Sequence, residues 1–97
     1  MTETRPSEFL AECFWPGVSH EDLRELDERA AAAAARLTGS GRPVRYAGSL
    51  LMRADEVVLC LFEGAELDVR AAAELAAIPF ERVLEAIRSP WPASDRP

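Results

Sequence analysis

A single carboxylate, Glu12, stands inside an otherwise apolar stretch of the chain, SEFLAECFWPG. Strict alternation along this stretch predicts a strand in which Glu12 shares one face with Leu10 and Phe14. A carboxylate in an apolar cleft acquires a raised pKa and can act as a general base, so Glu12 and Phe14 are candidate ligand-binding residues. The structural alternative is that Glu12 pairs with an arginine, such as Arg45 or Arg53, at the rim of a protein interface.

Three other polar residues could serve as an acid, a base or a ligand-positioning group: His20, Arg45 and Tyr46. The phenol of Tyr46 could donate a hydrogen bond to a ligand, or it could be an amphipathic strand residue whose hydroxyl reaches water. His20 is the only histidine and falls in the first turn of an expected helix, where a solvated residue is the structural alternative.

Metal binding requires several imidazole or thiolate ligands in a defined geometry. The available residues are His20, Cys13 and Cys60, and neither cysteine belongs to a CxxC pair. Their expected strand and loop positions give no reason for the three to converge, although a homodimer would supply each of them twice. We therefore predict no cofactor, with nickel or another transition metal disfavoured, and interpret the cysteines as buried thiols that fill space.

Charge and length restrict the classes of function. Among 97 residues, 17 are acidic and 11 are basic, which gives a net charge of −6. This balance argues against binding to nucleic acid or to an anionic membrane surface, both of which need clustered cations. No apolar stretch approaches the roughly 18 to 20 residues of a membrane span, and the N-terminus lacks the pattern of a signal peptide, so we expect a cytoplasmic protein.

Periodicity and turn residues predict one domain of six elements. The expected order is a strand ending at Pro16-Gly17, a helix over about 20–38, strands over 44–52 and 56–64, a helix over about 67–77, and an undecided element over 80–88. The undecided segment has helical apolar spacing, yet VLEAI could equally form an edge strand. If it is a strand, the order is that of an α+β, ferredoxin-like βαββαβ fold. We expect a flexible start over 1–7, a folded domain over 8–88 and a proline-rich tail over 89–97.

The stretch EVVLCLFEG, residues 56–64, carries six consecutive apolar residues. Alternation divides them into two faces: Val57, Leu59 and Leu61 on one, and Val58, Cys60 and Phe62 on the other. The helices of a two-layer domain cover only one face of the sheet. Burying one leucine or phenylalanine stabilises a protein by roughly 1.5 to 3 kcal/mol, so a second apolar face invites association. We therefore expect a homodimer in which two sheets pair face to face.

The segments FLAECFWPGVSHEDL, GRPVRYAGSLLMRADEVVLCLFEG and IPFERVLEAI together resemble a family of short, mostly actinobacterial proteins of unknown function, some described as nickel-binding. The best markers are the W-P-G turn, the R-P-V-R-Y-x-G-S strand and F-E-G at the end of the third strand. The likeness covers nearly all of residues 8–87. It implies a ferredoxin-like dimeric α+β barrel in which PFERVLEAI forms the fourth strand, against its helical periodicity.

The metal site of that family does not transfer to this chain. The nickel-binding branch has histidines near the end of the first strand and in the second helix. Here those places hold Cys13, Phe14 and Trp15, and the alanines of 71–73. The resemblance therefore implies a dimer without the histidine ligands.

Three functions follow from these patterns. The first is a small-ligand-binding homodimer of the nickel-binding-like family, with a pocket between sheet and helices or at the dimer interface. The second is a cofactor-free isomerase, cyclase or oxygenase acting on a small organic molecule, which rests on fold analogy. The third is a non-catalytic structural or interaction protein.

Overall fold

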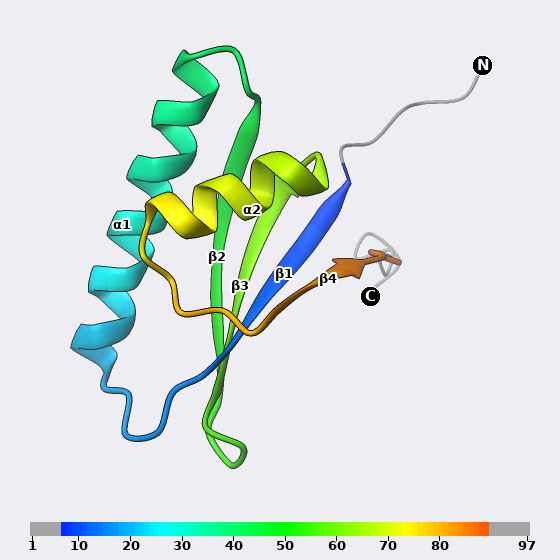
Figure 1. Ribbon diagram of the computed structural model, residues 1–97. Helices are drawn as coiled ribbons and strands as arrows, with labels where there is room; N and C mark the ends of the chain where they lie inside the picture. The colour runs from blue at the N-terminus through cyan, green and yellow to red at the C-terminus, as the bar shows by residue number, and fades with distance from the viewer. Residues whose placement is uncertain (1–6, 90–97) are drawn as a thin grey trace, which may run out of the picture.

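A four-stranded antiparallel sheet with two helices on one side forms the domain (Figure 1). The computed structural model describes residues 7–89. Along the chain the elements are β1 (Glu8–Phe14), α1 (His20–Gly39), β2 (Val44–Met52), β3 (Val57–Gly64), α2 (Glu66–Leu75) and β4 (Arg82–Ala86). The strands lie in the order β2-β3-β1-β4, which confirms the ferredoxin-like prediction with β1 and β3 as the central pair. Apart from Ser7 and Ser89, the two expected terminal segments lie outside the described residues.

Helix α1 begins at a capping box. The Ser19 hydroxyl accepts a hydrogen bond from the Asp22 amide, and the Asp22 carboxylate accepts one from the Ser19 amide, each at 3.0 Å. These two bonds satisfy backbone donors that the first helical turn leaves unpaired. Neither helix in the described part of the chain combines the length and apolarity of a membrane span.

The core lies between the helices and the inner face of the sheet. Alternate residues of β1 and β3 point into it, and alanines let the helices approach closely. Its largest fully buried side chains are Phe62, Leu26, Val58, Val69, Cys13 and Cys60. Val58, Cys60 and Phe62 therefore form the inner face of β3, and the other face of EVVLCLFEG points away from the helices.

The segment Arg82–Ala86 forms a strand, β4, that pairs with β1, although its apolar residues have helical spacing. Ala77 adopts a left-handed conformation with φ of 58°, and the buried Ile78 anchors the turn that follows α2. The chain then runs antiparallel to β1, with Leu84 opposite Leu10 and Val83 opposite Ala11. Pairing satisfies the backbone groups along the outer edge of β1, which a helix at this position would leave unpaired.

The β2–β3 hairpin contains an irregularity near Gly48. The register slips between Tyr46 and Gly48, and Gly48 has a φ of 115°. Gly64, at the end of β3, has no space for a side chain, because a Cβ atom there would lie 2.9 Å from the Pro43 carbonyl oxygen. This close approach requires glycine.

Candidate functional site

The predicted site residues do not gather in one place. Glu12, Phe14 and Arg45 lie on the side of the sheet that no described helix covers, here called the open face. Tyr46 lies on the opposite side, partly buried under α1. His20 is exposed at the first residue of α1. Three of the five candidates therefore share the open face, with Arg45 and Phe14 near its opposite ends.

Apolar side chains fill most of the open face. The strand register places Leu10 between Leu61 and Leu84, and Leu59 beside Leu50. The whole group, called the open-face cluster, consists of Leu10, Phe14, Leu50, Met52, Val57, Leu59, Leu61 and Leu84. Three members are strongly exposed: Phe14 at 53%, Leu50 at 62% and Met52 at 46%. An exposed apolar patch of this extent marks an interaction surface.

Ion pairs bound the open-face cluster at one end. Glu8 and Glu63 lie directly opposite each other in β1 and β3, which would be repulsive for two bare carboxylates. Each is paired with an arginine: Arg88 donates to Glu8 at 3.1 Å, and Arg45 donates to Glu63 at 2.9 Å through two nitrogens. The Arg45 guanidinium lowers the pKa of Glu63 below its ordinary value.

Glu12 stands within the apolar part of the open face. Its partner is Arg82 of β4, at 2.5 Å, so the expectation that Arg45 or Arg53 would pair with Glu12 is wrong. Glu12 lies opposite Arg82 in the β1–β4 register and opposite Leu59 on its other side. The ion pair satisfies the Glu12 carboxylate, and this geometry supports the structural alternative over a free general base.

Tyr46 belongs to a hydrogen-bonded cluster between α1 and β2. Its hydroxyl donates to Asp27 Oδ1 at 2.5 Å, and Ser49 donates to the same oxygen at 2.8 Å. Burial and the hydrogen bond to Asp27 raise the pKa of Tyr46. The ring packs against Phe62 with centroids 5.0 Å apart. The hydroxyl therefore joins α1 to the sheet.

The two cysteines meet in the core, although their convergence was not predicted from the sequence. They lie on the inner face of the central strands, where Cys13 is opposite Val58 and Cys60 is opposite Ala11. Both are free thiols, and a hydrogen bond with Cys13 together with burial raises the pKa of Cys60. Within residues 7–89, no three histidine, cysteine, aspartate or glutamate side chains come together as a metal-binding group.

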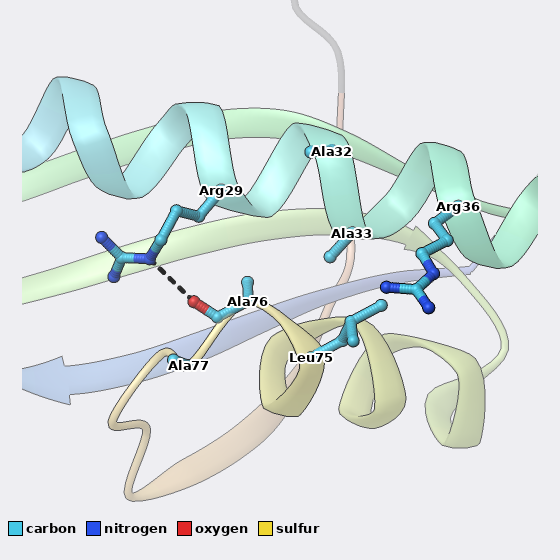
Figure 2. A pocket seen from close by; sticks show the side chains of 7 residues that line it. All are labelled: Arg29, Ala32, Ala33, Arg36, Leu75, Ala76 and Ala77. Atoms are coloured by element: carbon cyan, nitrogen blue, oxygen red, sulfur yellow. Dashed lines mark hydrogen bonds between the residues drawn. The ribbon is translucent and has the colours of Figure 1, made fainter.

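A second candidate region lies between the two helices, and it was not predicted from the sequence. It is a groove of about 290 Å³, here called the interhelical groove, lined by Arg29, Ala32, Ala33, Arg36, Leu75, Ala76 and Ala77 (Figure 2). Arg29 Nε donates to the Ala76 carbonyl oxygen at 2.9 Å. The available signal was the spacing of Arg29 and Arg36, because residues seven apart lie on the same side of a helix.

Comparison with known proteins shows the fold and no more. The chain matches no protein-family model, and no curated protein matches it. A solved structure that matches is that of SCO4226 from Streptomyces coelicolor A3(2), with a TM-score of 0.66 and 17% sequence identity. The alignment covers 86% of this chain and 99% of that one. The likeness shows the ferredoxin-like fold.

Proposed function

We propose that the protein is a cytoplasmic homodimer that binds a small molecule and that its subunits pair through their open faces. The observation that carries the proposal is the open-face cluster, eight apolar residues on the side of the sheet opposite the helices. A second copy that covers this cluster removes its apolar surface from water, which stabilises the dimer by roughly 25 cal/mol per Å² of apolar surface buried. The same face on both partners satisfies the symmetry of a two-fold dimer.

The size of the face sets the expected strength of the dimer. Four strands, the first of them seven residues long, span roughly 19 Å by 23 Å, or about 440 Å² in projection. The accessible area of a corrugated face exceeds its projection, and stable interfaces bury about 800 Å² per partner. We therefore expect a dimer near the lower end of the stable class, which dissociates in the micromolar range.

The Glu12–Arg82 pair supports ligand binding at the same interface. Between two paired faces, this carboxylate and guanidinium would sit among leucines. A few polar groups within an apolar lining are typical of small-molecule sites. A ligand with an apolar body and one anionic group fits Arg82, whose side chain remains 63% exposed in the single chain.

The dimer is tested by sedimentation equilibrium of the intact chain and of Leu50→Glu. Leu50 is 62% exposed, so the charge costs the single chain little but would be buried in the dimer. The matched control is Leu67→Glu on α2, where the leucine is 75% exposed. We expect twice the 10.7 kDa chain mass for the unaltered protein and for the control, and 10.7 kDa for Leu50→Glu. An unaltered chain that stays monomeric well above the micromolar range would refute the dimer.

The ligand is tested with 1-anilinonaphthalene-8-sulfonate, a small aromatic anion whose fluorescence rises in an apolar site. We expect saturable binding that is weakened by Arg82→Gln and retained by Arg88→Gln, because Arg88 lies beside Glu8 at the border. Equal binding by both variants would show that Arg82 does not hold the anion, and it would leave the dimer proposal unaffected.

We also infer that the chain is a divergent member of the nickel-binding-like family without its metal site. Phe14 ends β1, and Ala72 and Ala73 of α2 are fully buried, where a larger imidazole would overfill the core. Calorimetric titration with nickel should show no saturable heat. Stoichiometric heat would overturn this inference.

A further inference from the structure

The interhelical groove combines two cationic ends with an apolar floor. Arg29 and Arg36 descend from α1 toward the end of α2, and the methyl groups of Ala33 and Ala76 lie between them (Figure 2). Seven residues of helix separate the two arginines by about 10.5 Å along the α1 axis. A ligand that fits both ends must therefore be short and carry negative charge.

The groove carries two arginines, although the chain as a whole is acidic. Five arginines among residues 7–89 form ion pairs: Arg42, Arg45, Arg70, Arg82 and Arg88. The other four arginines of this range, Arg24, Arg29, Arg36 and Arg53, form none, although the chain has six more acidic than basic residues. Two arginines without carboxylate partners in the described chain thus line one groove.

Structural roles account for only part of this arrangement. Arg29 ties α1 to the carbonyl oxygen of Ala76, the C-cap of α2, but the bond uses Nε and leaves its terminal nitrogens available. Arg36 lies in the last turn of α1, where the helix dipole favours a cation, yet no hydrogen bond of its side chain occurs within residues 7–89. Both guanidinium groups therefore keep donors for a ligand.

The C-terminal cap of α2 forms one end of the groove. Ala77 lines it with a φ of 58°, a left-handed conformation that costs a residue with a side chain of order 1 kcal/mol or more. This conformation turns the chain away from α2 and leaves the Ala76 carbonyl oxygen directed at Arg29. The left-handed Ala77 closes α2 in a Schellman motif, in which the Ala77 amide donates to the Glu74 carbonyl oxygen and the Ile78 amide donates to the Ala73 carbonyl oxygen, each at 3.0 Å. This cap shapes one end of the groove.

We propose that the interhelical groove binds a short aliphatic dicarboxylate, with one carboxylate on Arg29 and the other on Arg36. Guanidinium and carboxylate groups pair with N···O distances of about 2.7 to 2.9 Å, often through two parallel bonds. The Cα atoms of the two arginines lie about 10.5 Å apart along the helix axis, and a dicarboxylate of about four to six carbons with a guanidinium bonded at each end has a similar length. Its methylene groups would lie over Ala33 and Ala76, and its two charges would neutralise both ends.

This site is independent of the proposed dimer. The groove is formed by α1 and α2, on the opposite side of the sheet from the open-face cluster. Pairing of two open faces would leave it accessible in both subunits. The monomeric variant Leu50→Glu should therefore bind the same dicarboxylate, and this separates failure of the groove proposal from failure of the dimer.

The test uses two five-carbon acids that differ by one charge, glutarate and pentanoate, titrated into the full chain and followed by amide chemical shifts. We expect saturable shifts at Ala32, Ala33, Ala76 and Ala77 with glutarate, and binding of pentanoate at least about tenfold weaker. Added salt should weaken glutarate more than pentanoate, because both of its ends are charged.

Arg36→Gln is the deciding variant, because it removes one charge and leaves the Arg29 tether intact. We expect it to weaken glutarate at least about tenfold and to reduce the difference between the two acids. Arg24→Gln is the matched control, since Arg24 is an exposed arginine of the same helix that does not line the groove. Equal affinities for the two acids, unchanged glutarate binding by Arg36→Gln, loss of binding in Leu50→Glu, or shifts confined to other residues would overturn the proposal.

Discussion

Replacing Tyr46 with phenylalanine isolates the bond that joins α1 to the sheet. The substitution keeps the ring that packs on Phe62 and deletes only the hydroxyl that donates to Asp27. A hydrogen bond to a charged group contributes about 1.5 to 3 kcal/mol, and Ser49 remains as a second donor to the same oxygen. We therefore expect a loss near the lower limit, about 1.5 kcal/mol. For a domain of this size that loss lowers Tm by roughly 6 to 12 °C.

The same substitution changes how stability depends on pH. The pKa of Tyr46 is raised in the folded protein by burial and by its bond to Asp27, whereas the unfolded value is about 10. Its contribution is complete below about pH 10 and is lost above it, because the unfolded chain releases a proton that the folded chain retains. The expected slope is about 1.4 kcal/mol per pH unit for the one group.

Tyr46 is the only tyrosine, so the absorbance of phenolate reports its ionisation directly. Urea unfolding followed by circular dichroism at about pH 7 and about pH 11 gives the stability at each pH. Tyr46→Phe should be less stable at neutral pH and should lose less stability on going to high pH. The control Ser49→Ala should also be less stable, but it should keep the full alkaline loss. Phenolate absorbance that titrates near pH 10 while the chain stays folded would refute the reasoning.

Three further substitutions test the packing of the fold by chemical denaturation. Gly64→Ala should lower the free energy of unfolding by about 1 to 3 kcal/mol, because a Cβ would meet the Pro43 carbonyl oxygen. The control Gly39→Ala should not destabilise the chain, because no atom lies within 4 Å of the added Cβ. Equal effects of the two substitutions would contradict this prediction. Leu26→Ala should cost about 2 to 5 kcal/mol, since Leu26 is fully buried, and a loss below about 1 kcal/mol would show a loose core. Ala77→Gly should raise stability by about 0.5 to 1 kcal/mol by relieving the left-handed conformation, and a lower midpoint would refute that strain.

Alternation and turn residues were sufficient to place most elements of the fold. Strand β2 has the predicted bounds, Val44–Met52, and the two-faced character of EVVLCLFEG is real, with Val58 facing the core and Leu59 facing away. Strand β4 was different, because its spacing also fits a helix. The need of β1 for a partner along its outer edge decides between the two, and that need is a property of the assembled sheet.

The candidate site was less predictable because its contacts join residues far apart in sequence. Glu12 was visible as a carboxylate in an apolar strand, but its partner Arg82 lies 70 residues away and depends on the β1–β4 register. The bond from Tyr46 to Asp27 likewise depends on how α1 crosses the sheet. Only the arginine pair of the interhelical groove left a local signal, its spacing of seven residues on one helix.

The sheet separates two surfaces of different chemistry. On the open face, Arg45, Arg82 and Arg88 each pair with a carboxylate, and the remaining side chains are apolar. Such a face suits a partner that presents the same kind of apolar surface. On the helical side, Arg36 has no carboxylate partner within the described chain, and the groove beside it is floored by methyl groups. Between the two lies a core whose inner strand residues, including Cys60 and Phe62, are fully buried. Since the open-face cluster and the interhelical groove share no residue, we expect association through one face and anion binding at the other to be energetically independent.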